Sequence, residues 1–183
     1  HANRVLKYNA QGAYLTSWGS AGSGDGQFAC ADWPCAIAVG TTGPVDYVYV
    51  LDAGNARIQR FSTAGVYLNQ WGAIGDGVVN CMVANARCDL AVDTQGNVYL
   101  ADYGANRIQR FSATGTYLSQ WGSSGTQDGQ FNGPCGIASD PRDTLYVLDC
   151  GNQRVQVFSP GGLFQSKWVP NTGPVTAPIS PVG

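Results

Sequence analysis

Short runs of alternating apolar and polar residues, separated by turn residues, recur along the chain. The clearest set lies at residues 88–93, 98–102, 107–111 and 116–121. The turns between these runs are rich in glycine, asparagine, serine and threonine. Runs of about five residues with a period of two, bounded by such turns, are typical of β-strands. The pattern therefore predicts an antiparallel meander of four short strands.

The same meander recurs with a fixed internal register. An arginine is followed eight residues later by a glycine and six residues after that by a tryptophan. The sets are Arg4, Gly12 and Trp18; Arg57, Gly65 and Trp71; Arg107, Gly115 and Trp121; and Arg154, Gly162 and Trp168. Successive arginines are 53, 50 and 47 residues apart. A period of this size indicates stacked repeats, and a repeated four-stranded antiparallel unit predicts an all-β fold of the β-propeller type.

The repeat divides the chain into five parts. Residues 1–18 contain only the third and fourth strands of a blade, at 4–8 and 13–18, so they form an N-terminal half-blade. Complete blades follow at 19–71, 72–121 and 122–168, and a proline-rich tail or linker at 169–183. Proline cannot donate to a strand ladder, so the tail is a poor central strand. It is a linker, an edge strand or an O-glycosylated segment, with Thr172, Thr176 and Ser180 as acceptors.

The fourth unit carries a family resemblance. The string DGQFNGPCGIASDPRDTLYVLDCGNQRVQVFSPGGLFQSKW at 128–168 resembles an NHL repeat, and the two preceding units are similar to it. The resemblance extends over residues 4–168 and implies a β-propeller, typically of six blades. Members of that family include binding scaffolds, RNA-binding domains, extracellular sensors and a few lyases. The resemblance therefore predicts the fold more strongly than the function.

Composition narrows the classes of partner. The chain has no glutamate and only two lysines, Lys7 and Lys167, and its net charge is −2. This charge argues against nucleic acid or an acidic membrane as the main partner. No window is apolar over the ~20 residues that a membrane-spanning helix needs. Six arginines (4, 57, 60, 107, 110 and 154) lie on predicted third strands rather than on one basic face, which disfavours RNA binding.

Two recurring features invite both a functional and a structural interpretation. An aspartate lies five residues before an arginine in the pairs Asp52 and Arg57, Asp102 and Arg107, and Asp149 and Arg154. These pairs are either a ring of ligand-binding charges or bridges between the second and third strands of each blade. The recurring tryptophans are either sugar platforms or packing residues. Repetition in every blade favours the structural interpretation of both. Gly54, Gly104 and Gly151 and the turn glycines 65, 115 and 162 are expected to supply positive φ angles.

The repeat also restricts the pairing of the six cysteines. Cys35, Cys88 and Cys135 occupy one repeat position, at the start of the first strand. Across the predicted hairpin at 140–143, Cys135 lies five residues before the turn and Cys150 seven residues after it, so the hairpin brings the two cysteines opposite each other. The other two blades lack that partner but have a cysteine upstream, so we predict Cys30–Cys35, Cys81–Cys88 and Cys135–Cys150. Three disulfides indicate an oxidising compartment, so the protein is expected to be secreted, periplasmic or at the cell surface.

Few residues of the sequence could form a catalytic or metal-binding site. His1 is the sole histidine, and the cysteine spacings do not match C-x₂-C, so no zinc site and no cofactor are predicted. Nucleophile activation and lyase-type propellers both require histidine, so no enzyme is predicted. Two carboxylate pairs, Asp89 with Asp93 and Asp140 with Asp143, lie at strand starts and turns, where aspartate is common for structural reasons.

Three functional hypotheses remain. In the first, the protein is a structural subunit, such as that of a fibre, whose half-blade is covered by a copy of itself through the terminal blades. In the second, the chain is part of a six-bladed secreted propeller. In the third, loops outside the repeat at 29–33, 41–46 and 78–87 bind a protein or glycan ligand. Trp33 is the first candidate contact residue, with Arg87 and Arg142 as further candidates.

Overall fold

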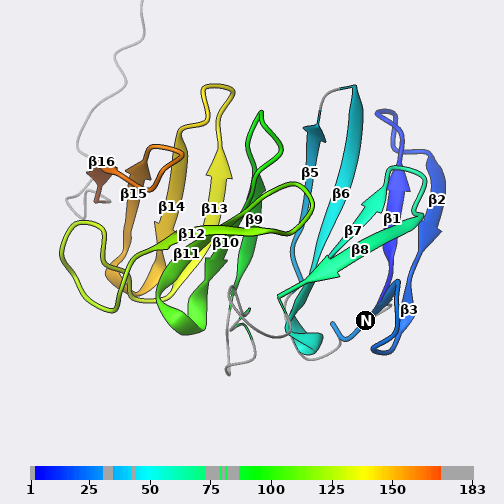
Figure 1. Cartoon of the computed structure of the whole chain (residues 1–183), viewed down its shortest axis with the longest axis horizontal. Coiled ribbons are helices and arrows are strands. Elements are labelled where there is room, and N and C mark those ends of the chain that lie inside the picture. The colour runs from blue at the N-terminus through cyan, green and yellow to red at the C-terminus, as the bar shows by residue number, and fades with distance from the viewer. Residues whose placement is uncertain are drawn as a thin grey trace, which may run out of the picture.

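The computed structural model describes residues 3–30, 35–42, 44–72, 79, 81 and 87–169 of the 183-residue chain. Over these residues the protein is all-β, with three four-stranded antiparallel sheets and two sheets of two strands. Figure 1 shows the sheets as blades that follow one another side by side in chain order, without closing into a ring. The prediction of a β-propeller fold is thereby confirmed.

Consecutive strands are neighbours within every blade. The half-blade consists of β1 (Val5–Tyr8) and β2 (Tyr14–Trp18). The second blade consists of β5 (Ile37–Thr42), β6 (Val45–Asp52), β7 (Arg57–Ser62) and β8 (Tyr67–Trp71). The third consists of β9 (Asp89–Val92), β10 (Val98–Asp102), β11 (Arg107–Phe111) and β12 (Tyr117–Trp121). The fourth consists of β13 (Pro134–Ser139), β14 (Leu145–Asp149), β15 (Arg154–Phe158) and β16 (Phe164–Trp168). A short parallel pair, β3 (Ser20–Ala21) with β4 (Gln27–Phe28), precedes the second blade.

The third and fourth strands of each blade share one irregularity. Their register shifts at Tyr8, Phe61, Phe111 and Phe158, which occupy the same repeat position. A bulge at this point bends the outer edge of the sheet. The half-blade repeats the irregularity, so its two strands have the conformation of an outer strand pair.

The turn between the second and third strands corrects one expectation about glycine. In each complete blade a short 3-10 helix connects the second strand to the third: η1 (Ala53–Asn55), η2 (Tyr103–Ala105) and η3 (Cys150–Asn152). The left-handed residues are Ala56, Asn106 and Gln153. Gly54, Gly104 and Gly151 do not have the positive φ expected from the sequence. Gly54 and Gly151 allow close approach of the backbone, since a Cβ at Gly54 would lie 2.1 Å from the carbonyl oxygen of Ala29.

The hydrophobic core lies between the blades rather than inside each sheet. One buried cluster joins the second and third blades and includes Leu51, Ile58, Leu90 and Leu100. A second cluster joins the third and fourth blades, and a third lies between the half-blade and the second blade. Each sheet is therefore stabilised by packing its hydrophobic side chains against a neighbouring blade, as expected for stacked repeats. Within the described residues no helix could span a membrane.

Candidate functional site

The repeated aspartate and arginine side chains meet inside each blade. Arg57 Nε lies 2.7 Å from Asp52 Oδ2, and these residues face each other across β6 and β7. The equivalent distances are 3.0 Å for Arg107 with Asp102 and 2.8 Å for Arg154 with Asp149. All three aspartates are fully buried. A buried carboxylate paired with its own strand neighbour is not available to a ligand.

Two of the arginines also anchor the loop that precedes their blade. The guanidinium of Arg57 donates to the carbonyl oxygens of Gly24 and Gln27. The guanidinium of Arg154 makes the corresponding bonds to Gln127 and Gln130. Buried carbonyl oxygens need such donors. The arginine therefore connects the strand pair to a loop, a role that the spacing of five residues could not reveal.

The six cysteines form the disulfides Cys30–Cys35, Cys81–Cys88 and Cys135–Cys150. Cys35 and Cys88 precede their first strands, whereas Cys135 lies within β13. The β13–β14 register shifts between Pro134 and Gly136, so Cys135 lies at an irregularity and has no ladder partner. Cys150 lies in η3, beyond the end of β14. The disulfide therefore spans the end of the hairpin instead of two paired ladder positions.

Two cysteine pairs lie close to a carboxylate. Cys30 and Cys35 are grouped with Asp52, and Cys81 and Cys88 with Asp102. A metal needs thiolate ligands, and sulfur in a disulfide is not a thiolate. The carboxylates of Asp52 and Asp102 also accept hydrogen bonds from arginine. These groups therefore do not have the donor chemistry of a metal centre while the disulfides are intact.

The repeated tryptophans pack between blades rather than within one. A Cβ built on Gly65 would lie 2.7 Å from the Trp18 ring, and Gly115 approaches Trp71 in the same way. Gly162 approaches Trp121. These turn glycines have φ angles of +85°, +94° and +85°. Each tryptophan thus lies over a glycine of the following blade, where any larger residue would collide with the ring. We call this contact the blade joint.

Aromatic side chains extend the blade joint on both sides. Between the second and third blades, Tyr49 packs edge-on against Trp71, which contacts Phe111, and Phe111 packs edge-on against Tyr117. Tyr99, Trp121, Phe158 and Phe164 repeat the series at the next joint. These two joints therefore have a tyrosine–tryptophan pair on one blade and a second aromatic pair with its glycine on the next, whereas at the joint of the half-blade Trp18 packs against Phe61, and Phe61 against Tyr67.

The joint tyrosines also have shifted pKa values. Burial raises the pKa of Tyr49. Burial also raises the pKa of Tyr99, and its hydrogen bond to the Asp93 carboxylate adds to the effect. The carboxyl of Asp140, in contrast, accepts hydrogen bonds from the backbone N–H groups of Thr144 and Arg142, which lower its pKa. These shifts have structural causes and do not converge on one reactive centre.

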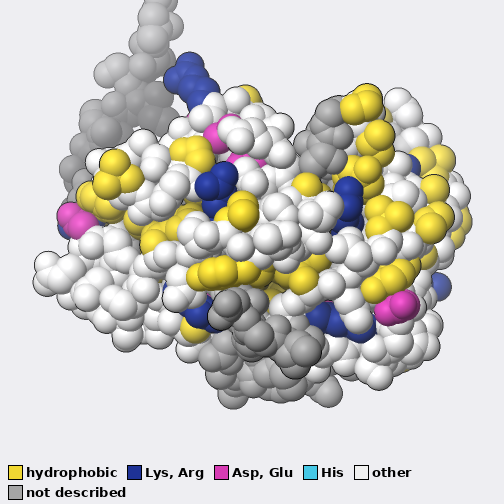
Figure 2. All heavy atoms as spheres, in the orientation of Figure 1, with side chains coloured by type: hydrophobic (Ala, Val, Ile, Leu, Met, Phe, Trp, Pro, Cys, Tyr) yellow, Lys and Arg dark blue, Asp and Glu magenta, His cyan; other side chains and the backbone are white. Residues whose placement is uncertain are grey.

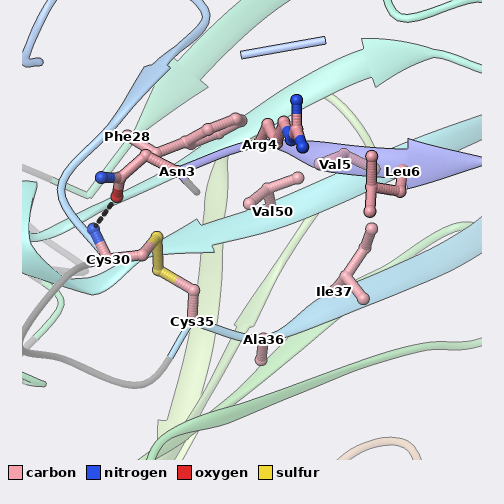
Figure 3. A pocket seen from close by; sticks show the side chains of 10 residues that line it. All are labelled: Asn3, Arg4, Val5, Leu6, Phe28, Cys30, Cys35, Ala36, Ile37 and Val50. Atoms are coloured by element: carbon pink, nitrogen blue, oxygen red, sulfur yellow. Dashed lines mark hydrogen bonds between the residues drawn. A yellow bond between two sulfur atoms is a disulfide. The ribbon is translucent and has the colours of Figure 1, made fainter. Parts of the chain in front are cut away.

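An apolar groove runs beside the free edge of β1. In the described residues β1 pairs with β2 alone. Two adjoining pockets of about 330 and 400 Å³ lie between β1 and the first two strands of the second blade. Figure 3 shows Leu6 of β1 and Ile37 of β5 pointing toward each other across this space. The position is where the first two strands of a complete blade would lie.

Side chains that line the groove are more exposed than side chains at the equivalent positions of the other blades. Ile37 is 54% exposed, whereas Leu90 and Ile137, at the same repeat position, are 4% and 6% exposed. Val39 is 62% exposed. Exposed hydrophobic side chains are visible at both ends of the array in Figure 2. A contiguous apolar surface of this kind is typical of an interaction site.

The remaining candidate residues that the structure describes lie away from the groove. Arg87 and Arg142 are exposed, and neither lines the groove. Trp33 lies outside the described residues, as do the glycosylation candidates Thr172, Thr176 and Ser180. The loops at 29–33, 41–46 and 78–87 are described only in part. Figure 2 shows lysine and arginine side chains scattered over the visible face.

Comparison with known proteins agrees with the architecture. The family model described as NHL repeat matches residues 89–111 and 131–158. These ranges cover β9 to β11 in the third blade, and Phe131 to the end of β15 in the fourth. The chain contains NHL repeats. The resemblance proposed from the sequence is confirmed, and no curated protein matches the chain.

Solved structures similar to this NHL-repeat chain include several propellers. Virginiamycin B lyase from Staphylococcus aureus has a TM-score of 0.60 and 14% identity, over 93% of this chain and 50% of that one. A protein of unknown function from Bacteroides thetaiotaomicron has a TM-score of 0.62 and 19% identity, over 86% and 39%. The WD40 repeats of RRP9 have a TM-score of 0.54 and 15% identity, over 77% and 42%. The NHL-repeat chain thus spans half or less of the length of these structures, and the likeness shows the fold alone.

Proposed function

We propose that this NHL-repeat protein is a non-enzymatic structural subunit that acts outside the cell and associates with copies of itself. The observation that carries the proposal is the groove beside β1, where Ile37 is 54% exposed although its equivalents Leu90 and Ile137 are buried. An unpaired strand edge next to an apolar surface favours addition of strands from a neighbouring chain. The three disulfides support an oxidising environment.

The chemistry of the described residues supports a non-enzymatic role. The aspartates that recur in each blade are buried in ion pairs, and the only histidine of the sequence is His1. General acid–base catalysis needs a titratable group in reach of a substrate. Two of the similar structures are lyases, but the likeness at 14% and 17% identity extends to fold alone.

The test of self-association is the mass of the disulfide-intact chain in solution. We expect sedimentation velocity to show species larger than the monomer, increasing with concentration. Ile37→Asp places a charge in the groove at a position that tolerates it in the monomer, and should remove those species. Val66→Asp is the matched control, because Val66 is 60% exposed but lies in the turn before β8. A chain that stays monomeric across the concentration range would exclude the proposal.

A second candidate is a larger propeller in which further blades of the same protein cover the groove. It is favoured by the length of the similar structures, since this chain spans 39% of the Bacteroides thetaiotaomicron protein and 50% of the virginiamycin B lyase. In this case a protein or glycan ligand would bind through the loops. The intact mass of the protein isolated from its source separates the candidates, since a longer chain supports the second.

A further inference from the structure

The blade joint has two complementary sides that are both left open at the ends of the array. Inside the array, the first side is a tyrosine–tryptophan pair, such as Tyr99 with Trp121 at 6.2 Å between ring centroids. The second side is an aromatic pair next to a turn glycine, such as Phe111 with Tyr117 and Gly115. Each of the two joints between complete blades brings one first side against one second side.

Among the described residues, no second side lies against the first side of the fourth blade. Tyr146 and Trp168 occupy the same repeat positions, with ring centroids 5.6 Å apart and rings tilted at 33°, whereas the equivalent pairs are edge-on at 6.1 and 6.2 Å. Trp168 is 56% exposed, and Tyr146 is half-buried where Tyr49 and Tyr99 are fully buried. Leu148 beside them is 43% exposed. The face therefore presents the tryptophan that elsewhere lies over the next blade.

The half-blade has a second side, and no first side in the described part of the chain lies against it. Tyr8 and Tyr14 pack edge-on at 6.0 Å and 75°, almost as Phe111 and Tyr117 do at 6.0 Å and 71°. The two tyrosines are 52% and 57% exposed. Gly12 has φ +81°, close to the +85° of Gly65, but no described atom lies within 4 Å of a Cβ built on it. Space for a tryptophan ring is present there.

We propose that Trp168 of one copy packs over Gly12, Tyr8 and Tyr14 of the next copy, so that the contact between chains reproduces the internal blade joint. The inference rests on the proposed self-association and adds a contact next to the groove, which Tyr8 also lines. A joint already formed three times within the chain supplies the geometry and the chemical complementarity. The Tyr146 hydroxyl would meet the carbonyl of Ala10, as the Tyr49 hydroxyl meets that of Ala113 at 3.3 Å.

Such a contact is heterologous, because it uses different surfaces on the two copies. After two copies pair, the pair keeps one free side of each kind, so the assembly either grows head to tail or closes as a ring. The aromatic series would continue from Tyr146 and Trp168 into Tyr8 and Tyr14 of the following copy. Aromatic rings in edge-on and tilted contact attract each other beyond the effect of burying their area.

The test uses the full-length, disulfide-intact chain and blocks one side at a time. Trp168→Ala removes the ring, and Gly12→Ala places a methyl group where the ring of the neighbouring copy would lie. The control for the first is Leu163→Ala, an exposed residue of the same blade. The control for the second is Gly129→Ala, because Gly129 has φ +79° and also no atom within 4 Å. Gly12 and Gly129 thus share the backbone strain, and thermal melting of each variant checks the fold.

We expect sedimentation velocity to show loss of species larger than the monomer for Trp168→Ala and for Gly12→Ala, but not for the two controls. An equimolar mixture of Trp168→Ala and Gly12→Ala should form a heterodimer, since each variant retains the side that the other lacks. Assembly that survives both variants would overturn the joint while leaving self-association intact. Loss with Trp168→Ala alone would indicate contact between two identical faces, which also overturns it. A monomeric wild-type chain would exclude both proposals.

Discussion

Trp121 and Trp168 have the same local structure but different surroundings. Each ends the outer strand of its blade, follows the same bulge and packs against the tyrosine of the second strand. Trp121 lies over Gly162 of the next blade, whereas Trp168 is 56% exposed. The sequence of a repeat therefore determines the strand, and the neighbouring blade determines how much its tryptophan contributes to stability.

The largest effect is expected from removing an internal tryptophan. Trp121→Ala should lower the free energy of unfolding by about 3–5 kcal/mol, because it opens a cavity between the third and fourth blades. Trp168→Ala should lower it by only about 0.5 kcal/mol in the monomer, as is usual for exposed side chains. Urea unfolding of the monomeric variants, followed by tryptophan fluorescence and circular dichroism, measures both values.

One result would contradict this comparison of Trp121 with Trp168. Equal destabilisation by the two substitutions would mean that Trp168 is already covered within the chain, and that its face is not open for association. Leu163→Ala serves as a reference for an exposed apolar residue of the fourth blade, with Leu163 73% exposed. Trp168→Ala should resemble this variant rather than Trp121→Ala.

The fold was predictable from the sequence because strand periodicity and turn chemistry are local. The runs at 98–102 and 107–111 are β10 and β11 with the same bounds. The blade joint was not predictable in the same way. A recurring tryptophan shows that a position is equivalent in each unit, but not whether its ring packs within the unit or against the next one. The partner glycine Gly115 was read as a turn residue, although it also leaves room for Trp71.

Long-range contacts of the buried charges were also beyond sequence reasoning. The spacing of Asp52 and Arg57 suggests a pair, but the guanidinium also binds carbonyl oxygens of the preceding loop. Backbone carbonyls carry no signature in the sequence, so such contacts are not visible in a motif. The shifted register at Cys135 was missed for a related reason, since symmetric counting from a turn assumes a regular ladder.

A prediction of intermediate size compares two residues at the same position of the first strand, Ile137 in the fourth blade and Ile37 in the second. Ile137→Ala should lower the free energy of unfolding by about 3 kcal/mol, because Ile137 is buried between the third and fourth blades. Ile37→Ala should cost less than about 1 kcal/mol in the monomer, where its side chain is half exposed. If self-association covers the groove, the cost at Ile37 should rise with protein concentration, as thermal melting over a dilution series would show. A cost at Ile37 that matches Ile137 in dilute solution would contradict an open groove.

The smallest effect concerns the tyrosine of an internal joint at alkaline pH. Burial raises the pKa of Tyr99 above its ordinary value of 10.0, so the folded state holds this proton more tightly than the unfolded state. The stability from this difference is fully present below pH 10 and is lost as the pH rises from there toward the folded pKa. Tyr99→Phe should therefore show a shallower loss of unfolding free energy above pH 10 than the wild type.

At neutral pH the Tyr99→Phe variant should be less stable by about 1 kcal/mol, since it lacks the hydrogen bond to Asp93. Chemical unfolding at pH 7 and at steps from pH 9 to about 11 measures both effects. Parallel pH profiles for the two proteins would show that Tyr99 ionises equally in the folded and unfolded chain, and that the joint does not exclude water from its hydroxyl.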